Sequence, residues 1–515
     1  MPLLSVDRLS THYPATDGTV RAVDDVSLEI VEGETVALVG ESGCGKSTLG
    51  KSLMRLVNPT SGQVTFKGRD VAAMSGKELR SIRRHIQMIF QDPFASLNPR
   101  QTIRTILTSP LAVHGIGDRK SREAIAASMV VHVGLPADSL DRYPHEFSGG
   151  QRQRIGIARA LILQPELVIC DEPVSALDLS IQAQILNLLV EMKTELSLSY
   201  LFISHDLSVV RYFADRVLVM YLGRIVESAP TARLWNEAKH PYTQALIAAV
   251  PALAPPPREP AADSQPVLSI SGLCKSYGNT RALHDASLDL ARGTTLSVVG
   301  ESGSGKTTLA KLTVRLIEPT GGDIAINGKS FLGAKGAALR QQRRNVQMIF
   351  QDPYGSLNPR RRVGDTIARA AVLAGATGRD ARAKAHELLE LVGLTPEAYF
   401  RRPSAFSGGQ RQRIGIARAL AMGPDILIAD ESVSALDVSV QTQILALLQE
   451  LQAKFGLSIL FITHDLRVAA QISDRVVVMK NGQIVEAGDA MTVLTAPQHP
   501  YTRELIAAAP GRGIV

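Results

Sequence analysis

The chain has 515 residues, of which 45% are hydrophobic and 20% are charged. This length exceeds what one hydrophobic core organises and this composition excludes a mainly disordered chain, so we predict roughly two to four compact domains. The formal net charge of +7 comes from 56 basic and 49 acidic residues, a mild excess that fits nucleic acid, a phosphate-rich ligand or a membrane surface equally well.

The first residues, MPLLSVDRLSTHY, lack the basic stretch and apolar core of a secretory signal. No window reaches the roughly eighteen uninterrupted apolar residues of a membrane-spanning helix. We therefore expect a cytosolic chain that does not itself span a membrane. Cys44, Cys170 and Cys274 show no metal-ligand spacing, and disulfides are not expected in that compartment.

A glycine-rich segment follows the first strongly apolar stretch. ETVALVG, residues 34–40, predicts a buried strand, and GESGCGKST, residues 40–48, leads from it into a predicted helix. This is the pattern of a phosphate-binding loop, in which backbone N–H groups surround the phosphates, a lysine neutralises them and a hydroxyl binds Mg²⁺. A chance glycine-rich turn is the alternative. The candidate nucleotide-binding residues are Gly40, Ser42, Gly43, Cys44, Gly45, Lys46, Ser47 and Thr48.

Two polar segments come next along the chain. Gln91, in QMIFQDP, is placed to complete a shell around Mg²⁺ or water. FSGGQRQRIGIARAL, residues 147–161, begins a predicted helix with a serine and two glycines, which present backbone N–H groups to an anion. Since the phosphate loop already supplies one anion site, this segment predicts a site built from both. Its candidate residues are Ser148, Gly149, Gly150 and Gln151.

Two more apolar stretches end in residues suited to hydrolysis. LVICDEP ends with Asp171 and Glu172, of which one can hold Mg²⁺ and the other can orient or deprotonate water. YLFISHD ends with His205, whose N–H can contact a terminal phosphate. An isolated acidic pair is more often a helix cap and a lone histidine more often structural, but the nearby phosphate loop favours hydrolysis. Tyr13 is placed to stack on adenine, with an ordinary surface aromatic as the alternative.

The whole set recurs in the second half at a nearly constant offset, including FSGGQRQRIGIARAL letter for letter at residues 406–420. A proline-rich stretch, PALAPPPREPAADSQP, separates the copies and favours an extended linker. We predict a tandem duplication with a first domain at 1–250, a linker at 251–266 and a second domain at 267–515. The second set of candidates is Tyr277, Gly300, Ser302, Gly303, Ser304, Gly305, Lys306, Thr307, Thr308, Gln351, Ser407, Gly408, Gly409, Gln410, Asp430, Glu431 and His464.

Apolar stretches alternate with helical periodicity such as IQAQILNLLVEMKTEL, residues 181–196. This alternation predicts an α/β fold around a mainly parallel sheet in each copy. In such sheets ligands bind beyond the carboxyl ends of the strands, where the motifs fall. The candidate Mg²⁺ ligands are Ser47, Gln91, Asp171, Thr307, Gln351 and Asp430.

The motifs, in this order and with SALD at 175–178 and 434–437, resemble the nucleotide-binding domains of ABC ATPases, a group of P-loop NTPases, throughout both copies. The resemblance implies ATP and Mg²⁺ as cofactors, a helical subdomain in each copy, and catalytic roles for the glutamine, glutamate and histidine already named. In that family two domains pair head to tail around ATP. The resemblance therefore implies that residues 407–410 complete the Lys46 site and residues 148–151 the Lys306 site.

Finer features are similar to the fused ATPase subunits of oligopeptide and dipeptide importers. These are phenylalanine before SGGQ, the QDPxxSLNPR extension, and HPYT at 240–243 and 499–502. They imply an ATP hydrolase that energises import of peptides or related small solutes, two integral-membrane permease subunits, and an extracytoplasmic substrate-binding protein as indirect partner. The expected location is peripheral, on the cytoplasmic face of the plasma (inner) membrane.

Two alternatives stay open. Nickel importers share much of this pattern, so nickel is the alternative substrate. A soluble tandem ATPase acting on ribosomes is the alternative function. Members of that group carry a long, charged, helical linker between their domains, which the proline- and alanine-rich stretch of this chain does not resemble. We expect no nucleic-acid partner. Because no cysteine-bearing tail follows either HPYT, no iron–sulfur cluster is predicted.

Overall fold

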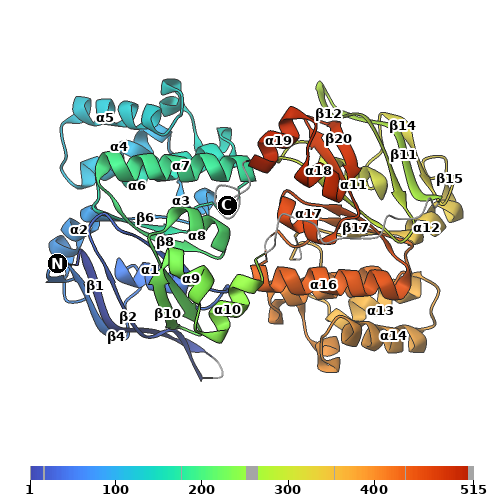
Figure 1. Cartoon of the computed structure of the whole chain (residues 1–515), viewed down its shortest axis with the longest axis horizontal. Helices are drawn as coiled ribbons and strands as arrows, with labels where there is room; N and C mark the ends of the chain where they lie inside the picture. Colours follow the sequence, from blue (N-terminus) through green and yellow to red (C-terminus); the bar gives the residue numbers. More distant parts are fainter. Residues whose placement is uncertain are drawn as a thin grey trace. The chain divides into compact units, whose positions relative to one another are not determined.

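The computed structural model describes residues 2–15, 18–174, 177–250, 265–352, 354–434 and 436–507. The chain divides into two compact units, the first of which ends at Val250 (Figure 1). Each unit contains one copy of the repeat and is described by itself. The predicted linker lies outside the described residues except for Gln265 and Pro266, and strand β11 already begins at Pro266.

A six-stranded sheet forms the core of the first unit. All residues of its strands β3, β7 and β8 are buried, as expected for parallel strands covered by helices on both faces. The strands are parallel except for the edge strand β10, which is antiparallel to β9. The order across the sheet is β10 (Arg224–Pro230), β9 (Arg216–Tyr221), β3 (Thr35–Val39), β8 (Ser199–Ser204), β7 (Leu167–Asp171) and β6 (Ile86–Ile89).

The parallel arrangement brings the predicted motifs to one edge of this sheet. The phosphate loop follows β3, Asp171 ends β7, His205 follows β8, and Gln91 comes two residues after β6. The three apolar stretches predicted as strands are therefore confirmed as β3, β7 and β8.

A second, antiparallel sheet packs alongside. Its strand β2 alternates exposed and buried residues, so that Val26, Leu28 and Ile30 point into the core. The order is β2 (Gly18–Ile30), β1 (Leu4–Ala15), β4 (Ser61–Phe66) and β5 (Arg69–Asp70).

Helices cover the main sheet and form the predicted helical subdomain. Ile106, Val130 and Ile155, from α4, α5 and α6, belong to one apolar cluster. Figure 1 shows α4 and α5 on the side of the unit opposite the antiparallel sheet. The helices are α1 (Lys46–Leu53), α2 (Gly76–His85), α3 (Pro93–Ser96), α4 (Ile103–Val113), α5 (Arg119–His132), α6 (Gly149–Leu161), α7 (Leu179–Leu196), α8 (Leu207–Phe213), α9 (Thr231–Glu237) and α10 (Pro241–Ala248).

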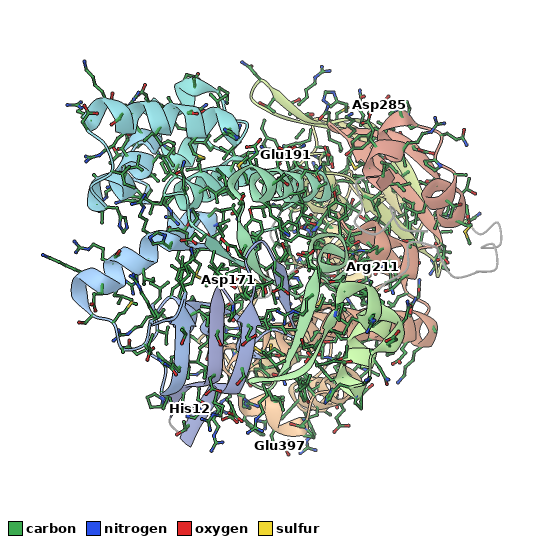
Figure 2. The ribbon with its side chains drawn as sticks, turned by 60° about the vertical axis from the view of Figure 1, so that its left-hand side comes forward. His12, Asp171, Glu191, Arg211, Asp285 and Glu397 are labelled. Atoms are coloured by element: carbon green, nitrogen blue, oxygen red, sulfur yellow. The ribbon has the colours of Figure 1, made fainter. Side chains whose placement is uncertain are left out.

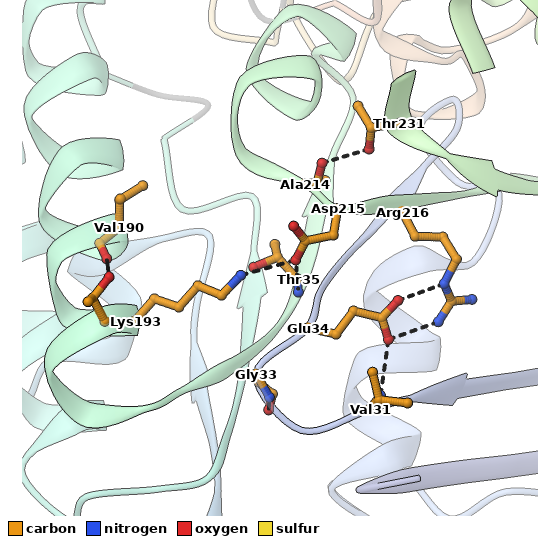
Figure 3. Close-up of polar contacts among 12 residues, drawn as sticks. Val31, Gly33, Glu34, Thr35, Val190, Lys193, Ala214, Asp215, Arg216 and Thr231 are labelled. Atoms are coloured by element: carbon orange, nitrogen blue, oxygen red, sulfur yellow. Dashed lines mark hydrogen bonds and ion pairs between the residues drawn. The ribbon is translucent and has the colours of Figure 1, made fainter. Parts of the chain in front are cut away.

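Polar contacts fix the amino end of β3 beside β9 (Figure 3). The N–H of Thr35 donates to the Asp215 carboxylate at 2.8 Å. The guanidinium of Arg216 donates to both oxygens of Glu34, at 2.7 and 3.1 Å. The N–H of Val31 also donates to Glu34, at 3.0 Å. These contacts hold the strand that leads into the phosphate loop.

The second unit repeats this architecture. Its main sheet has the order β16 (Val346–Ile349), β17 (Ile426–Asp430), β18 (Ser458–Ile462), β13 (Thr295–Val299), β19 (Arg475–Lys480) and β20 (Gln483–Asp489). Its antiparallel sheet has the order β12 (Thr280–Ala291), β11 (Pro266–Tyr277), β14 (Gly321–Ile326) and β15 (Lys329–Ser330). Its helices are α11 (Lys306–Thr313), α12 (Gly336–Asn345), α13 (Val363–Leu373), α14 (Gly378–Leu391), α15 (Gly408–Leu420), α16 (Val438–Phe455), α17 (Leu466–Ile472), α18 (Ala490–Thr495) and α19 (Pro500–Ala507).

Candidate active site in each copy

The glycine-rich segment of the first copy forms a tight loop between β3 and α1. Gly40 and Gly45 have φ angles of 156° and 107°, which side chains rarely tolerate. A Cβ atom on Gly45 would lie 1.8 Å from the carbonyl oxygen of Ala22, and one on Gly40 would lie 2.2 Å from that of Met220. Glycine is therefore required at both positions, because the loop packs directly on the backbones of β2 and β9.

The second copy builds the same loop between β13 and α11. A Cβ atom on Gly300 would lie 2.2 Å from the carbonyl oxygen of Met479. Helices α1 and α11 each begin at the motif lysine, so the predicted order of strand, loop and helix is confirmed twice. The remaining predicted loop residues occupy these loops and first helical turns: Ser42, Gly43, Cys44, Thr48, Ser302, Gly303, Ser304, Gly305 and Thr308.

Each loop encloses the ammonium group of its lysine. Lys46 is only 4% exposed, and its Nζ donates to the carbonyl oxygens of Gly40 and Glu41 at 2.7 and 2.9 Å. Lys306 makes the same pair of bonds in the second copy, at 2.7 and 2.8 Å. A buried positive charge inside a loop at a helix N-terminus fits a bound phosphate group.

A hydroxyl and a buried carboxylate meet beside each loop. Ser47 Oγ donates to Asp171 at 2.7 Å, and Thr307 Oγ1 donates to Asp430 at 3.3 Å. Figure 2 shows Asp171 inside the first unit, where burial raises its pKa. Burial raises the pKa of Asp430 to about 6, and the adjacent charge of Glu431 adds to this effect. Both carboxylates thus lack enough positive charge around them.

This donor set fits Mg²⁺, which prefers oxygen ligands and would supply the missing charge. Within the described ranges, no group of three or more histidine, cysteine or acidic side chains is arranged to hold a metal by itself.

The second acid of each pair receives two polar side chains. Gln91 Nε2 donates to Glu172 at 2.9 Å, and His205 Nδ1 lies 3.2 Å from the same carboxylate oxygen. In the second copy Gln351 Nε2 donates to one carboxylate oxygen of Glu431 at 2.7 Å, and His464 Nδ1 lies 3.6 Å from the other oxygen. Each histidine thus contacts the glutamate through Nδ1, and the predicted contact of the ring with a terminal phosphate stays a prediction.

The backbone of these glutamates is strained. Glu172 and Glu431 have φ angles of 46° and 43°, in the left-handed region, which costs of order 1–3 kcal/mol for a residue other than glycine. Burial tends to raise the pKa of Glu431, but the hydrogen bond and charge of His464 and the charge of Lys306 outweigh it, so the net pKa is lowered. A carboxylate that stays ionised beside a phosphate loop is suited to act on water.

The SGGQ segments cap helices α6 and α15. Ser148 Oγ accepts the N–H of Gln151 at 3.4 Å, and the Gln151 side chain accepts the N–H of Ser148 at 3.0 Å. Ser407 and Gln410 form the same capping box. A Cβ atom on Gly150 would lie 2.6 Å from the Ile181 side chain of α7, so the second glycine lets the two helices approach.

The corresponding contact in the second copy would bring a Cβ atom on Gly409 to 2.4 Å from Val440. Gly149 and Gly408 stand in the first turns of α6 and α15. The predicted helix start at the serine is therefore confirmed in both copies.

The predicted adenine-stacking tyrosines lie at or near strand ends. Tyr13 lies in β1, two residues before its last residue Ala15, and is 39% exposed, whereas Tyr277 is the last residue of β11 and is 51% exposed. The ammonium of Lys275 lies 5.1 Å from the Tyr277 ring centre. Their exposed rings are compatible with stacking, which stays a prediction. Three residues of the SALD segments lie outside the described ranges: Ser175, Ala176 and Ala435.

The HPYT segments make a contact that the sequence reasoning missed. The hydroxyl of Tyr242, in the first turn of α10, accepts the N–H of Glu41 in the phosphate loop at 2.9 Å. Tyr501, in α19, accepts the N–H of Glu301 at 3.3 Å. In the sequence, HPYT indicated only the family. Its recurrence at the same place after both sheets was the signal that indicates a structural role.

The fold and the loops define a P-loop nucleotide-binding protein with two similar domains. The family profile described as ABC transporter matches residues 23–175 and 283–434. The profile described as oligopeptide/dipeptide transporter, C-terminal region, matches residues 226–275 and 485–513. The chain belongs to the ABC transporter family, as its ATP-binding, ATP-hydrolysing component. The fold class and family predicted from the motifs are confirmed.

Relatives that match nearly the whole chain include the glutathione import ATP-binding protein GsiA of Escherichia coli (strain K12) and of Shigella dysenteriae serotype 1 (strain Sd197). Each is 42% identical to the chain, with 99% of this chain and 89% of the relative covered. A solved structure of the ATP-binding cassette MJ0796 bound to ADP and Pi, a dimer in a post-hydrolysis state, is 29% identical and has a TM-score of 0.42, covering 44% of this chain and 98% of that one. CbiO1 from Clostridium perfringens is 29% identical with a TM-score of 0.41, covering 46% of this chain and 91% of that one.

Throughout the ranges that the structure describes, no helix has both the length and the apolar character needed to cross a bilayer.

Proposed function

We propose that the chain energises import of peptides, or of small peptide-like solutes such as glutathione, through a membrane permease. The observation that carries this proposal is the presence of the oligopeptide/dipeptide transporter C-terminal region in both copies. The glutathione import proteins that match nearly the whole chain support the same class of substrate. Nickel import and action on ribosomes, the two alternatives left open by the sequence, find no specific support in these comparisons.

The loop lysines, Lys46 and Lys306, neutralise the phosphates of ATP in this proposal. Tyr13 and Tyr277 stack on the adenines. Mg²⁺, when bound by the hydroxyls of Ser47 and Thr307 with the neighbouring aspartates and glutamines, neutralises charge on the phosphate oxygens. The support for these roles is the buried lysine inside each loop and the short hydroxyl–carboxylate contact beside it.

Glu172 and Glu431 act on the attacking water. Each carboxylate accepts a proton from a water molecule whose oxygen bonds to the γ-phosphorus, while the bond from that phosphorus to the bridging oxygen of ADP breaks. Gln91 and His205 orient Glu172 and its water, and Gln351 and His464 do the same for Glu431. The supporting geometry is the pair of contacts that each glutamate receives.

Each ATP is completed by the other copy in this proposal. Residues 148–151 serve the Lys306 loop and residues 407–410 serve the Lys46 loop, as the family resemblance implies. Two helix N-termini with serine caps, one in each copy, supply the donors that such an arrangement requires. Both copies retain every motif residue, so both sites hydrolyse ATP.

Two permease subunits in the membrane and an extracytoplasmic substrate-binding protein complete the transporter that we propose. The chain then lies at the cytoplasmic face of the plasma (inner) membrane and contacts the permeases only. Membership of the transporter family supports this arrangement.

Transport by the assembled complex tests the proposal. The chain is purified from membranes with its permeases, reconstituted in vesicles, and supplied with ATP, the binding protein and one of three radiolabelled solutes: a dipeptide, glutathione or nickel. We expect dipeptide or glutathione to accumulate with the natural chain. With the double variant Lys46→Ala, Lys306→Ala we expect no accumulation. Accumulation of nickel alone, or purification of the chain with ribosomes instead of permeases, would show that the proposed function is wrong.

A further inference from the structure

One peptide group of the first phosphate loop is bonded at both of its polar atoms. Its oxygen, the carbonyl of Gly40, accepts from Lys46 Nζ at 2.7 Å. Its N–H, which belongs to Glu41, donates to the hydroxyl of Tyr242 at 2.9 Å. Because the two atoms lie in one planar amide, a rotation of this group would break both bonds together.

The second copy repeats the arrangement. The carbonyl of Gly300 accepts from Lys306 Nζ at 2.7 Å, and the N–H of Glu301 donates to Tyr501 at 3.3 Å. The helices that carry the tyrosines read PYTQALIA and PYTRELIA and so differ on their outer faces. The contact between hydroxyl and loop is retained across this difference.

The first tyrosine is itself held in place. The carboxylate of Glu227, on β10, accepts the N–H groups of Lys239 and His240 at 2.8 and 3.1 Å. His240 Nδ1 accepts the N–H of Tyr242 at 3.2 Å, and the Tyr242 ring lies 4.3 Å from that of Tyr221, centre to centre. The hydroxyl that meets the loop is therefore positioned by Glu227 and His240 of the C-terminal region and by Tyr221 of β9.

The second tyrosine has the same supports. The carboxylate of Glu486 accepts the N–H groups of Gln498 and His499 at 2.8 and 3.1 Å. His499 Nδ1 accepts the N–H of Tyr501 at 3.2 Å, and Lys480 Nζ lies 4.3 Å from the Tyr501 ring centre. The contacts recur although Gln498 stands in place of Lys239 as one donor and Lys480 in place of Tyr221 beside the ring.

We propose that Tyr242 and Tyr501 are positioning residues for the phosphate-loop lysines, through which the C-terminal region of each copy sets the affinity of its own loop for ATP. When ATP binds, the lysine must leave the loop carbonyls for the phosphates. The tyrosine hydroxyl keeps the amide in its orientation during this exchange. ATP binding then does not carry the free-energy cost of ordering the loop. The inference rests on the proposed role of Lys46 and Lys306.

Removing only the hydroxyl tests this inference. Tyr242→Phe is made in the full chain carrying Lys306→Ala, so that the Lys46 loop is the one that binds, and affinity is measured with a fluorescent ATP analogue. Loss of this partly buried hydrogen bond predicts a Kd about three- to tenfold higher. In the permease complex, KM for ATP should rise by a similar factor while kcat changes less. Tyr212→Phe, the same change at a residue that is 60% exposed on α8, should leave Kd unchanged.

A thermal measurement separates positioning from simple anchoring of α10. Without nucleotide, Tyr242→Phe should unfold at a somewhat lower temperature than Tyr212→Phe because it loses the bond to Glu41, and it alone should also show a smaller stabilisation by ATP. Lower stability of Tyr242→Phe with an unchanged Kd would overturn the inference. Tyr501→Phe with Lys46→Ala repeats the test in the second copy. Retained ATP binding when both lysines are replaced would instead overturn the proposed nucleotide site.

Discussion

At the scale of single residues, Glu172 and Glu431 receive the most consequential contacts, because each is met by a glutamine amide and a histidine ring. General bases contribute about 10²–10⁴-fold to rate. We expect Glu172→Gln and Glu431→Gln each to slow hydrolysis at the altered site by about two powers of ten while sparing ATP binding. Single-turnover phosphate release and equilibrium binding measure the two effects.

Glu195→Gln is the control for this pair, since Glu195 is half exposed on α7 and should tolerate the change. Full hydrolysis in one of the two glutamine variants would show that only the other copy is catalytic.

Asp430 makes the stability of the second unit depend on pH. Its pKa is raised from 3.8 to about 6, so the folded chain retains a proton that the unfolded chain has released. The free energy of unfolding therefore falls as pH rises from about 4 to about 6. Without nucleotide or Mg²⁺, we expect Asp430→Asn to be more stable than the natural chain by about 2–3 kcal/mol at about pH 7, with little difference at about pH 4.

Urea unfolding at the two pH values measures this difference. Equal effects of Asp430→Asn at both values would mean that the substitution acts through packing and that the titration of Asp430 contributes nothing.

Cys44 places a thiol inside the first loop, with Sγ 3.9 Å from Lys46 Nζ. A maleimide attached there would fill the space around the lysine, so we expect modification to block ATP binding at this loop and MgATP to protect against it. Burial raises the pKa of Cys170, which should therefore react slowly. Cys44→Ser reproduces the serine of the second loop and should bind ATP without thiol sensitivity. Stoichiometric modification of Cys44 with unchanged affinity would show that it is only a tolerated small residue.

The residues of the site were predictable wherever a motif fixes chemistry to spacing, as for Lys46 and Ser47. Two features were not. The left-handed φ of Glu172 depends on how β7 and β8 end, and the bond from Tyr242 to Glu41 joins segments about two hundred residues apart. Neither leaves a local pattern of polar and apolar residues.

At the scale of elements, the strands of the main sheets were the most predictable parts, because buried parallel strands read as continuous apolar runs. The amphipathic α2 and the strands of the antiparallel sheets were not assigned beforehand. The register between strands β1 and β2 includes several irregularities, such as those between Val6 and Thr11. They interrupt the alternation of buried and exposed residues that identifies a strand.

The ion pair between Glu34 and Arg216 supports β3 in the first unit, where the two side chains are 13% and 27% exposed. Bidentate, partly buried pairs of this kind are stronger than surface pairs. We expect Glu34→Gln to lower the free energy of unfolding of the first unit by about 1–2 kcal/mol. Glu318→Gln, at an ion pair whose carboxylate is 65% exposed, should change it by less than about 0.5 kcal/mol.

Urea midpoints of the two variants make the comparison. Equal midpoints would show that the Glu34 pair adds no more than a surface contact, and that the amino end of β3 is fixed by the Thr35 and Asp215 contact instead.

At the scale of the whole molecule, the duplication was evident from sequence because identical segments recur in order. The pairing of the copies around ATP has no comparable pattern in the sequence. Hydrophobic periodicity reports only what is buried within one unit, and the SGGQ helix N-termini are polar. The pairing is thus a prediction from family resemblance.

A charged side chain in place of the serine of each SGGQ segment, Ser148 or Ser407, tests this pairing. Ser148→Arg removes a hydroxyl and fills the N-terminus of α6, so ATP held by the Lys306 loop would lose its second set of donors as charge develops on the γ-phosphate. Loss of one such donor typically costs about 3 kcal/mol, or two to three powers of ten in rate. We expect Ser148→Arg to suppress hydrolysis at the Lys306 site and to leave ATP binding at the Lys46 loop intact, and Ser407→Arg to do the reverse.

Total turnover does not discriminate, because cooperativity between the sites would lower it in both variants. Vanadate trapping of a photoreactive nucleotide in the permease complex, followed by mapping of the labelled loop, resolves the two sites. Gly156 and Gly415, within the same helices but with no neighbouring side chain near an added Cβ, provide Gly→Ala controls that should trap at both sites. Loss of trapping at Lys46 but not at Lys306 in Ser148→Arg would mean that each copy closes its own site, and the pairing of the two copies around ATP would be wrong.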